Sequence, residues 1–267
     1  MMIPFTKGHG TGNDFVLVFD PDCQFDLDEE VVALVCNRSF GIGADGLIRI
    51  TKKDGVWFMD YRNADGTIAE ICGNGTRVMA KYLVLNHLVD GPTFEIGTRA
   101  GLIPVISKHD GSFTVELGPV INLNEKVLVE VGDNQLQGNV LSAPNPHVVT
   151  IVSNLENLGN LLDSPKHLPT PILPQGANFE FVQIISASEV SMRVFERGVG
   201  ETLSCGSGAC AVAVFLQQSL NFDSPITINV PGGKLILEPI PENKVKLTGP
   251  AKLVAWGEID IEALRNK

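Results

Sequence analysis

The chain has 267 residues, of which 44% are hydrophobic and 19% charged, an ordinary composition for a globular protein. Its formal net charge of −11 argues against binding to nucleic acid or to anionic membranes, which requires Lys and Arg. No stretch approaches the ~18 apolar residues of a membrane-spanning helix, and the first eight residues lack the apolar core of a signal peptide. We therefore expect a soluble, cytoplasmic protein.

In the first half of the chain, short apolar or alternating runs predict strands, and two segments with helical periodicity predict helices. The strands are expected over residues 15–19, 46–50, 56–61, 93–96 and 113–117, and the helices over residues 28–37 and 76–84. The best candidate for a linker follows, at residues 119–124 after a Gly-Pro pair.

The second half repeats this pattern, with strands expected over residues 226–230 and 244–247. Its helix, residues 209–216, is apolar nearly all round and is therefore expected at the centre of its domain. Residues 164–175 contain four prolines and are expected to form a loop. Each half is thus predicted to be a set of strands around one buried helix.

The two halves also repeat at the level of motifs, with an offset of about 133 residues. Six motifs keep one order: Gly12-Asn13-Asp14-Phe15-Val16 with Pro144-Asn145-Pro146-His147-Val148, Gly43-Ala44-Asp45 with Gly176-Ala177-Asn178, Asn63 with Glu196, Cys72 with Cys205, Gly101 with Gly233, and Leu117-Gly118-Pro119 with Thr248-Gly249-Pro250. A period of this size indicates two homologous domains.

Each half places one cysteine, Cys72 or Cys205, in a Gly-x-Gly turn that leads into a helix. The first amides of a helix have no internal partner and carry partial positive charge, so a carboxylate can dock there. The same field favours a thiolate and can lower a cysteine pKa below its usual value of about 8.5. Two such turns could hold one α-carboxylate and flank its α-carbon with a thiolate and a thiol, an acid/base pair.

Other interpretations of the cysteines were weighed. Inert packing is the ordinary role of a buried cysteine and is our expectation for Cys23, Cys36 and Cys210. A redox pair is disfavoured because neither motif is Cys-x-x-Cys, and a zinc site is disfavoured because no closely spaced ligand pairs exist. The odd count of five cysteines also argues against a secreted disulfide framework.

Several polar residues lie in or beside the repeated motifs. Asn13 matches Asn145, and Asn63 matches Glu196, although Asn is common in turns for local reasons. Glu196 and Arg197 could recognise an ammonium and a carboxylate, or could form a surface ion pair. His147 could tune a nearby thiol.

These motifs resemble one family, the diaminopimelate epimerases. The resemblance runs from residue 7 to about residue 258 and is carried by the following segments: His9-Gly10-Thr11-Gly12-Asn13-Asp14-Phe15, Asn63-Ala64-Asp65-Gly66, Cys72-Gly73-Asn74-Gly75-Thr76-Arg77, Asn145-Pro146-His147, Glu196-Arg197-Gly198-Val199-Gly200-Glu201-Thr202 and Cys205-Gly206-Ser207-Gly208-Ala209-Cys210. One departure is Gly46, where many members have Gln.

The resemblance implies an α/β chain of the α+β kind, with two pseudo-symmetric domains over residues 1–119 and 120–250. Each domain would be a strand-rich barrel around a central helix, with the active site in the interdomain cleft. A last strand within residues 251–267, around Leu253 to Ile259, would return to the first domain. The implied protein is a cytoplasmic homodimer.

The resemblance also implies the activity. The enzyme would be an isomerase that interconverts LL- and meso-2,6-diaminopimelate on the route to lysine and peptidoglycan, with no metal, no pyridoxal phosphate and no other cofactor. Cys72 and Cys205 would be the acid/base residues. The expected binding residues are Gly73, Asn74, Gly206 and Ser207 for the α-carboxylate, Asn63 and Glu196 for the α-ammonium, and Asn13, Asn145, Asn178 and Arg197 for the distal end; His147 and Glu196 would adjust the thiol pKa values.

Three alternatives stay open at this point. Proline and hydroxyproline racemases share the architecture and the paired thiols, although the stretch from Glu196 to Thr202 disfavours them. A thiol redox or metal-binding protein, and a non-catalytic amino-acid binder, would each present cysteines without α-proton exchange.

Overall fold

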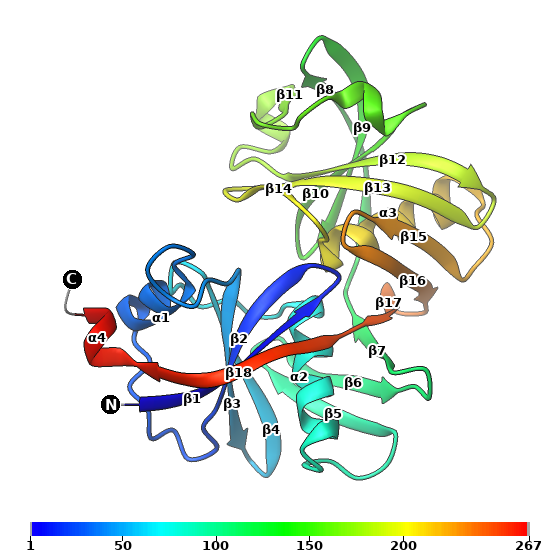
Figure 1. The fold of residues 1–267 in the computed structure, drawn as a ribbon. Helices are drawn as coiled ribbons and strands as arrows, with labels where there is room; N and C mark the ends of the chain where they lie inside the picture. Colours follow the sequence, from blue (N-terminus) through cyan, green and yellow to red (C-terminus); the bar gives the residue numbers. More distant parts are fainter. Residues whose placement is uncertain (1, 266–267) are drawn as a thin grey trace. The chain divides into compact units, whose positions relative to one another are not determined.

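The computed structural model describes residues 2–265 and divides into two compact units. Unit 1 comprises the residues up to Val115 together with those from Gly249 onward, and unit 2 comprises Glu116–Thr248. Figure 1 shows both units, each rich in strands. Met1, Asn266 and Lys267, which the sequence assigns to the first domain, lie outside the described residues.

Unit 1 is a curved sheet of eight strands. In spatial order they are β18 (Lys252–Asp260), β1 (Met2–Gly10), β2 (Asn13–Phe19), β3 (Gly46–Lys53), β4 (Val56–Asn63), β5 (Thr93–Thr98), β6 (Gly101–Ser107) and β7 (Ser112–Leu117). Neighbours run antiparallel except at β2–β3 and β4–β5, which run parallel. The strand latest in sequence, β18, pairs with the first, β1.

Unit 2 repeats this order. Its main strands are β8 (Ile121–Val131), β9 (Asn134–Ala143), β10 (Asn145–Ile151), β12 (Asn178–Ser186), β13 (Glu189–Glu196), β15 (Ile226–Val230), β16 (Gly233–Ile240) and β17 (Lys244–Pro250). The two parallel pairs, β10–β12 and β13–β15, fall at the same places as in unit 1. The internal repeat of the sequence is therefore a repeat of topology.

Unit 2 also carries small additions. They are β11 (Lys166–Leu168), β14 (Gly200–Thr202) and the 3₁₀ turns η1 (Leu155–Leu158) and η2 (Thr170–Ile172). Residues 164–175, expected to form a proline-rich loop, contain β11 and η2. Strand β11 pairs with β8.

A central helix lies against the strands of each unit. Helix α2 (Gly73–Leu85) packs against β1, β2, β3, β4, β6 and β18, and α3 (Gly206–Leu220) packs against β8, β9, β10, β12 and β16. The first eleven residues of α3 are buried apart from Ser207, as expected for a helix that is apolar nearly all round. The predicted fold class, two pseudo-symmetric strand-rich domains each around a central helix, is confirmed.

Two shorter helices complete unit 1. Helix α1 (Glu29–Cys36) begins at Asp28, whose carboxylate accepts a hydrogen bond from the Val31 amide at 2.8 Å, and it packs against α4 (Ile261–Arg265). Among residues 2–265, no helix combines the length and the apolar composition needed to cross a membrane.

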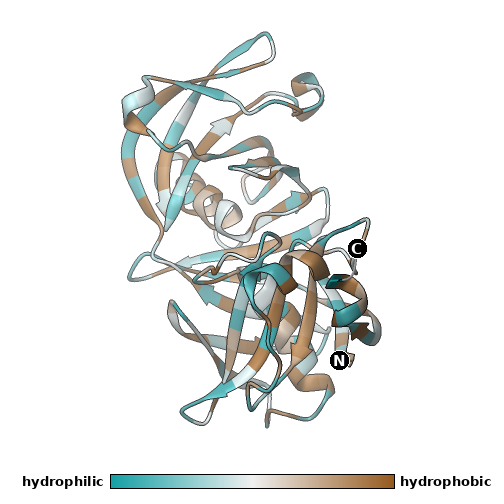
Figure 2. Cartoon of the chain, turned by 90° about the vertical axis from the view of Figure 1, so that its left-hand side faces the viewer, coloured by the Kyte–Doolittle hydropathy of each residue, from teal (hydrophilic) through white to brown (hydrophobic). Residues whose placement is uncertain are grey.

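Alternation of side chains explains most strands, and Figure 2 shows hydrophilic and hydrophobic residues alternating along many of them. β15, for example, buries every second residue. The sequence analysis did not identify the hairpin of β8 and β9. Residues 123–126 at its start are all exposed, so they show no alternating apolar pattern.

Strand register corrects one detail of the sequence repeat. Phe15 pairs with Gly46 across β2 and β3, and His147 pairs with Asn178 across β10 and β12. Since Phe15 and His147 occupy equivalent positions in the two sheets, Asn178 is equivalent to Gly46. The match of Asp45 with Asn178 inferred from the sequence is wrong by one residue.

Candidate active site

Both cysteines of the repeat occupy the N-cap of a central helix. Cys72 precedes the first residue of α2, and Cys205 precedes the first residue of α3, each with extended backbone. Neither thiol caps its helix through a side-chain hydrogen bond, and no acidic residue lies in either first turn. The first-turn amides therefore add positive potential beside each sulfur, and no acidic side chain of the same turn offsets it.

In unit 1, a chain of hydrogen bonds connects Cys72 to the start of β2 and to the residue that precedes β3. The Cys72 thiol donates to Asn13 Oδ1 at 3.7 Å, and Asn74 Nδ2 donates to the same oxygen at 3.1 Å. Asn13 Nδ2 in turn donates to Asp45 Oδ2 at 2.7 Å. Because Asp45 accepts from the amide nitrogen of Asn13, the amide oxygen of Asn13 is directed to the cysteine loop.

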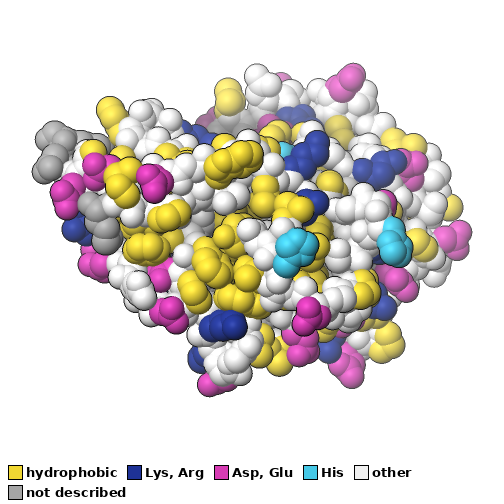
Figure 3. Space-filling model, turned by 60° about the horizontal axis from the view of Figure 1, so that its bottom comes forward, with side chains coloured by type: hydrophobic (Ala, Val, Ile, Leu, Met, Phe, Trp, Pro, Cys, Tyr) yellow, Lys and Arg dark blue, Asp and Glu magenta, His cyan; other side chains and the backbone are white. Residues whose placement is uncertain are grey.

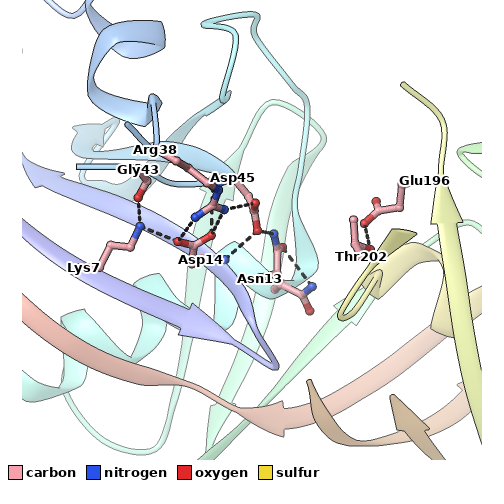
Figure 4. Close-up of polar contacts among 9 residues, drawn as sticks. Lys7, Asn13, Asp14, Arg38, Gly43, Asp45, Glu196 and Thr202 are labelled. Carbon is pink, nitrogen blue, oxygen red and sulfur yellow. Dashed lines mark hydrogen bonds and ion pairs between the residues drawn. The ribbon is translucent and has the colours of Figure 1, made fainter. Parts of the chain in front are cut away.

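Asp45 belongs to a charged cluster, drawn in Figure 4. Arg38 bridges Asp45 and Asp14 at 2.7 and 2.8 Å, and Lys7 lies 2.6 Å from Asp14 and also donates to the Gly43 carbonyl. Partial burial would raise the pKa of Asp14, but hydrogen bonds from Arg38 and Lys7 outweigh it and lower this pKa to about 2. Asp14 is therefore ionised at neutral pH, and Arg38 connects it to Asp45.

Asn63, expected near the α-ammonium, lies at the end of β4 and donates to Thr67 Oγ1 at 3.0 Å. Asp65 accepts from the amide and hydroxyl of Thr67 at 2.9 and 2.6 Å. The Asn63-Ala64-Asp65-Gly66 motif is thus a tight turn closed by its own side chains.

In unit 2, Cys205 is 5% exposed and lies close to acidic side chains. Its sulfur lies 3.5 Å from Ser207 Oγ. Glu196, which ends β13, accepts a 2.5 Å hydrogen bond from the Thr202 hydroxyl, and the Cys205 thiol acts to lower its pKa. Cys205 therefore shares a buried site with a carboxylate, whereas Cys72 bonds a neutral amide.

Burial raises the pKa of the Cys205 thiol well above its ordinary value, and the negative charges of Glu196 and Glu180 raise it further. Burial also raises the pKa of Glu196. The lowered pKa that the helix N-terminus led us to expect is wrong for Cys205, because desolvation and the two carboxylates outweigh the hydrogen bonds from Ser207 and the Gly208 amide. Cys205 is thus a neutral thiol in this structure.

The remaining polar residues of unit 2 lie near the starts of β10 and β12 and just after the end of β13. Asn178 Oδ1 accepts from the Arg197 amide at 2.8 Å, and the Arg197 guanidinium donates to the Gln175 carbonyl at 3.3 Å. Asn145 is exposed at the start of β10, and His147, two residues later, is fully buried.

The structure thus connects Asn13, Cys72 and Asn74 in unit 1, and pairs Asn178 with Arg197 and Glu196 with Cys205 in unit 2. Gly73 and Gly206 are the first residues of α2 and α3, beside the two thiols. Two partners were not predicted from the sequence, Asp45 of Asn13 and Glu180 of His147. Asp45 lay within a repeated motif, which was a usable signal; Glu180 lay in an apolar strand with no such signal.

Among residues 2–265, no group of three or more His, Cys, Asp or Glu side chains is arranged to hold a metal ion.

We predict that Glu196→Gln lowers the pKa of the Cys205 thiol, since it removes a negative charge that disfavours the thiolate. Alkylation of Cys205 by iodoacetamide, followed by peptide mass spectrometry from pH 6 to 11, should show a midpoint at lower pH. Glu238→Gln, a change at an exposed carboxylate of β16, is the matched control and should leave the midpoint unchanged. An unchanged or higher midpoint in Glu196→Gln would contradict the assignment.

Comparison with known proteins identifies close relatives in sequence. The family model described as diaminopimelate epimerase matches residues 5–123 and 140–254. The diaminopimelate epimerase of Streptomyces coelicolor is 41% identical over 277 residues, covering 97% of this chain and 96% of the relative. That of Thermobifida fusca is 41% identical over 278 residues, covering 98% and 99%.

Solved structures share the fold at much lower identity. A PhzF-family phenazine biosynthesis protein from Bacillus anthracis has a TM-score of 0.71 and 15% identity, covering 97% of this chain and 99% of the other. A hydroxyproline epimerase from Agrobacterium vitis has a TM-score of 0.69 and 13% identity, covering 97% and 92%. Likeness at this identity speaks for the fold alone, whereas the family model and the sequence relatives extend over nearly the whole chain. The chain therefore belongs to the diaminopimelate epimerase family.

Proposed function

We propose that this chain interconverts LL- and meso-diaminopimelate by acid/base catalysis, with Cys72 and Cys205 as the two proton-transfer groups. The observation that carries the assignment of these residues is their matched position: each is the N-cap of the central helix of its unit. Family membership supports the substrate, which its sequence relatives carry in their names. The reaction would then supply precursors of lysine and peptidoglycan.

The proposed step moves one proton on each side of the α-carbon. A cysteine thiolate removes the α-proton and becomes a thiol, while the other thiol donates its proton to the opposite face and becomes a thiolate. The electron pair left on the α-carbon is delocalised into the α-carboxylate during the step. The two cysteines end with exchanged protonation states, and exchange with solvent restores the starting form. These steps use protein groups alone.

The amides of Gly73 and Asn74 and those of Gly206 and Ser207 would stabilise the charge that develops on the α-carboxylate. Backbone donors at a helix N-terminus are fixed before the reaction, so they do not reorganise as charge develops. The bound α-ammonium would lie near Asn63 and Glu196. The positive charge of the ammonium offsets the negative charge of Glu196. This lowers the pKa of Cys205 when the substrate binds.

The distal amino-acid end would be held by Asn145, Asn178 and Arg197. The guanidinium of Arg197 suits a carboxylate because it can donate two parallel hydrogen bonds. Asn13 is also assigned to this end, although in the free protein both ends of its amide are engaged, with Asp45 and with the cysteine loop. Binding through Asn13 would therefore use its remaining N–H.

Incubation with LL-diaminopimelate in heavy water tests the mechanism. The wild type should place deuterium at the reacting α-carbon, detected by mass spectrometry and NMR. Cys72→Ala and Cys205→Ala should each reduce epimerisation by at least about 1,000-fold, because each removes an essential proton carrier. Cys23→Ala, a change at an exposed cysteine of unit 1, should keep full activity.

Absence of α-deuterium with reduced wild-type protein would contradict the function. Full epimerisation by either active-site variant would contradict the two-base scheme. Proline and trans-4-hydroxyproline serve as alternative substrates in the same assay, and turnover of these in place of diaminopimelate would assign the chain to the racemases.

Asp45→Asn tests the support of Asn13. The variant loses the carboxylate that accepts from the Asn13 amide, so we expect a 10- to 100-fold fall in kcat/KM, the usual scale for losing an orienting partner. Asp54→Asn is the control, because this exposed turn residue has φ of 52°, a conformation that Asn tolerates. Activity of Asp45→Asn equal to that of the control would show that Asn13 needs no such support.

We propose that the protein is a homodimer and that unit 1 carries the contact surface. Strand β18 exposes Trp256 and Val254, with Trp256 82% exposed, and the neighbouring β1 exposes Met2. Exposed aromatic and aliphatic side chains on adjacent strands are typical of protein contacts. Figure 3 shows hydrophobic side chains gathered in the middle of one face, with charged groups around them.

Light scattering on a sizing column tests the dimer. The wild type is expected at twice the chain mass, and Trp256→Glu at the mass of one chain. Leu162→Glu alters a residue of unit 2 with the same 82% exposure and should leave the dimer intact. A monomeric wild type at tens of micromolar would refute the proposal.

We also propose the cytoplasm as the compartment, since the five cysteines are all free thiols. Recovery in the cytosolic fraction of cells is the expected result.

A further inference from the structure

A histidine and a glutamate form a fully buried pair in unit 2. His147 Nδ1 lies 2.7 Å from Glu180 Oε1, and both side chains are 0% exposed. The two residues come from the adjacent parallel strands β10 and β12. Desolvation makes such a pair costly, and well-packed apolar residues of similar volume often serve stability as well or better.

The other half of the molecule shows that the fold does not require this pair. Strand register makes Phe15 equivalent to His147 and Ile48 equivalent to Glu180. Unit 1 therefore fills the same two positions with apolar side chains that are also fully buried. The internal repeat thus provides a natural apolar version of the same site.

Two equivalent glycines locate this site beneath the cysteine helices. A Cβ placed on Gly75 of α2 would lie 3.0 Å from Ile48 Cδ1 and 3.5 Å from Phe15 Cε1. A Cβ placed on Gly208 of α3 would lie 2.5 Å from Glu180 Oε1. Gly208 therefore leaves room for the carboxylate directly beneath the first turn that Cys205 caps.

Within residues 2–265, His147 Nε2 and Glu180 Oε2 are both buried and make no hydrogen bond. Glu180 lies beside the cysteine turn of α3, because its carboxylate fills the space that a Cβ on Gly208 would need, and its negative charge contributes to the raised pKa values of Glu196 and Cys205. A histidine whose Nδ1–H is held by a carboxylate presents Nε2 as its proton-accepting atom.

We propose that Glu180 is a positioning residue, which accepts the Nδ1–H of His147 and leaves Nε2 as the nitrogen that exchanges a proton with a catalytic thiol. When Nε2 accepts that proton, the thiol becomes a thiolate and the imidazole becomes an imidazolium, which the Glu180 carboxylate stabilises. When the proton returns, both groups revert. This role rests on the proposed epimerase function.

Transplanting the pair of unit 1 into unit 2 tests the proposal. The double variant His147→Phe/Glu180→Ile should fold with a melting temperature no lower than that of the wild type. Its exchange of the substrate α-proton in heavy water should fall by at least about 100-fold. Exchange within threefold of the wild type would overturn the proposal. Glu238→Gln, at an exposed carboxylate of the same unit, should retain wild-type exchange.

Two further measurements test the role of Glu180 if the double variant does not fold. Long-range ¹H–¹⁵N NMR of the wild type should show His147 Nδ1 protonated from pH 6 to pH 9, and an Nε2–H tautomer with bare Nδ1 would overturn the proposal. Glu180→Gln should lower kcat about 10- to 100-fold and shift the pH profile of kcat/KM, with KM changed little. An unshifted profile with wild-type kcat would refute the role.

The NMR result also separates this inference from the function. A wild type that shows the expected tautomer but exchanges no α-proton would refute the epimerase assignment and leave the His147–Glu180 geometry in place.

Discussion

Each half of this molecule depends on one constraint: a cysteine caps the helix that packs against the strands of that half. The strands fix the helix, and the helix fixes the direction in which its first amides and its cysteine point. Gly73 and Gly206 begin these helices and leave the approach to the amides open. Duplication of this arrangement places two thiols in equivalent backbone environments.

The side chains then make the two thiols unequal. Cys72 is partly exposed and bonds the neutral amide of Asn13, whereas Cys205 is buried beside the Glu196 carboxylate, which together with burial raises its pKa. An epimerase that acts on one of two chemically identical ends of its substrate gains from this difference. Equivalent backbone can serve both configurations at the reacting carbon, while unlike side chains recognise one fixed configuration at the distal carbon.

Much of the fold followed from sequence because its signals are local. The apolar helix of residues 209–216, the Gly-x-Gly turns and the alternating strands each depend on residues close in the chain. The repeat of Cys72 and Cys205 identified the candidate catalytic residues for the same reason. The hairpin of β8 and β9 was missed because its exposed start has no apolar alternation, and it forms through pairing with neighbouring strands.

The sequence by itself determined the duplication, the two cysteines and their place at helix starts, since short-range backbone preferences govern all three. Only the tertiary structure decided which side chains support them. Asp45 meets Asn13, and Glu180 meets His147, across about thirty residues of chain, because parallel strands β2–β3 and β10–β12 bring them together. Burial likewise decided the pKa of Cys205, since desolvation depends on packing that no local pattern records.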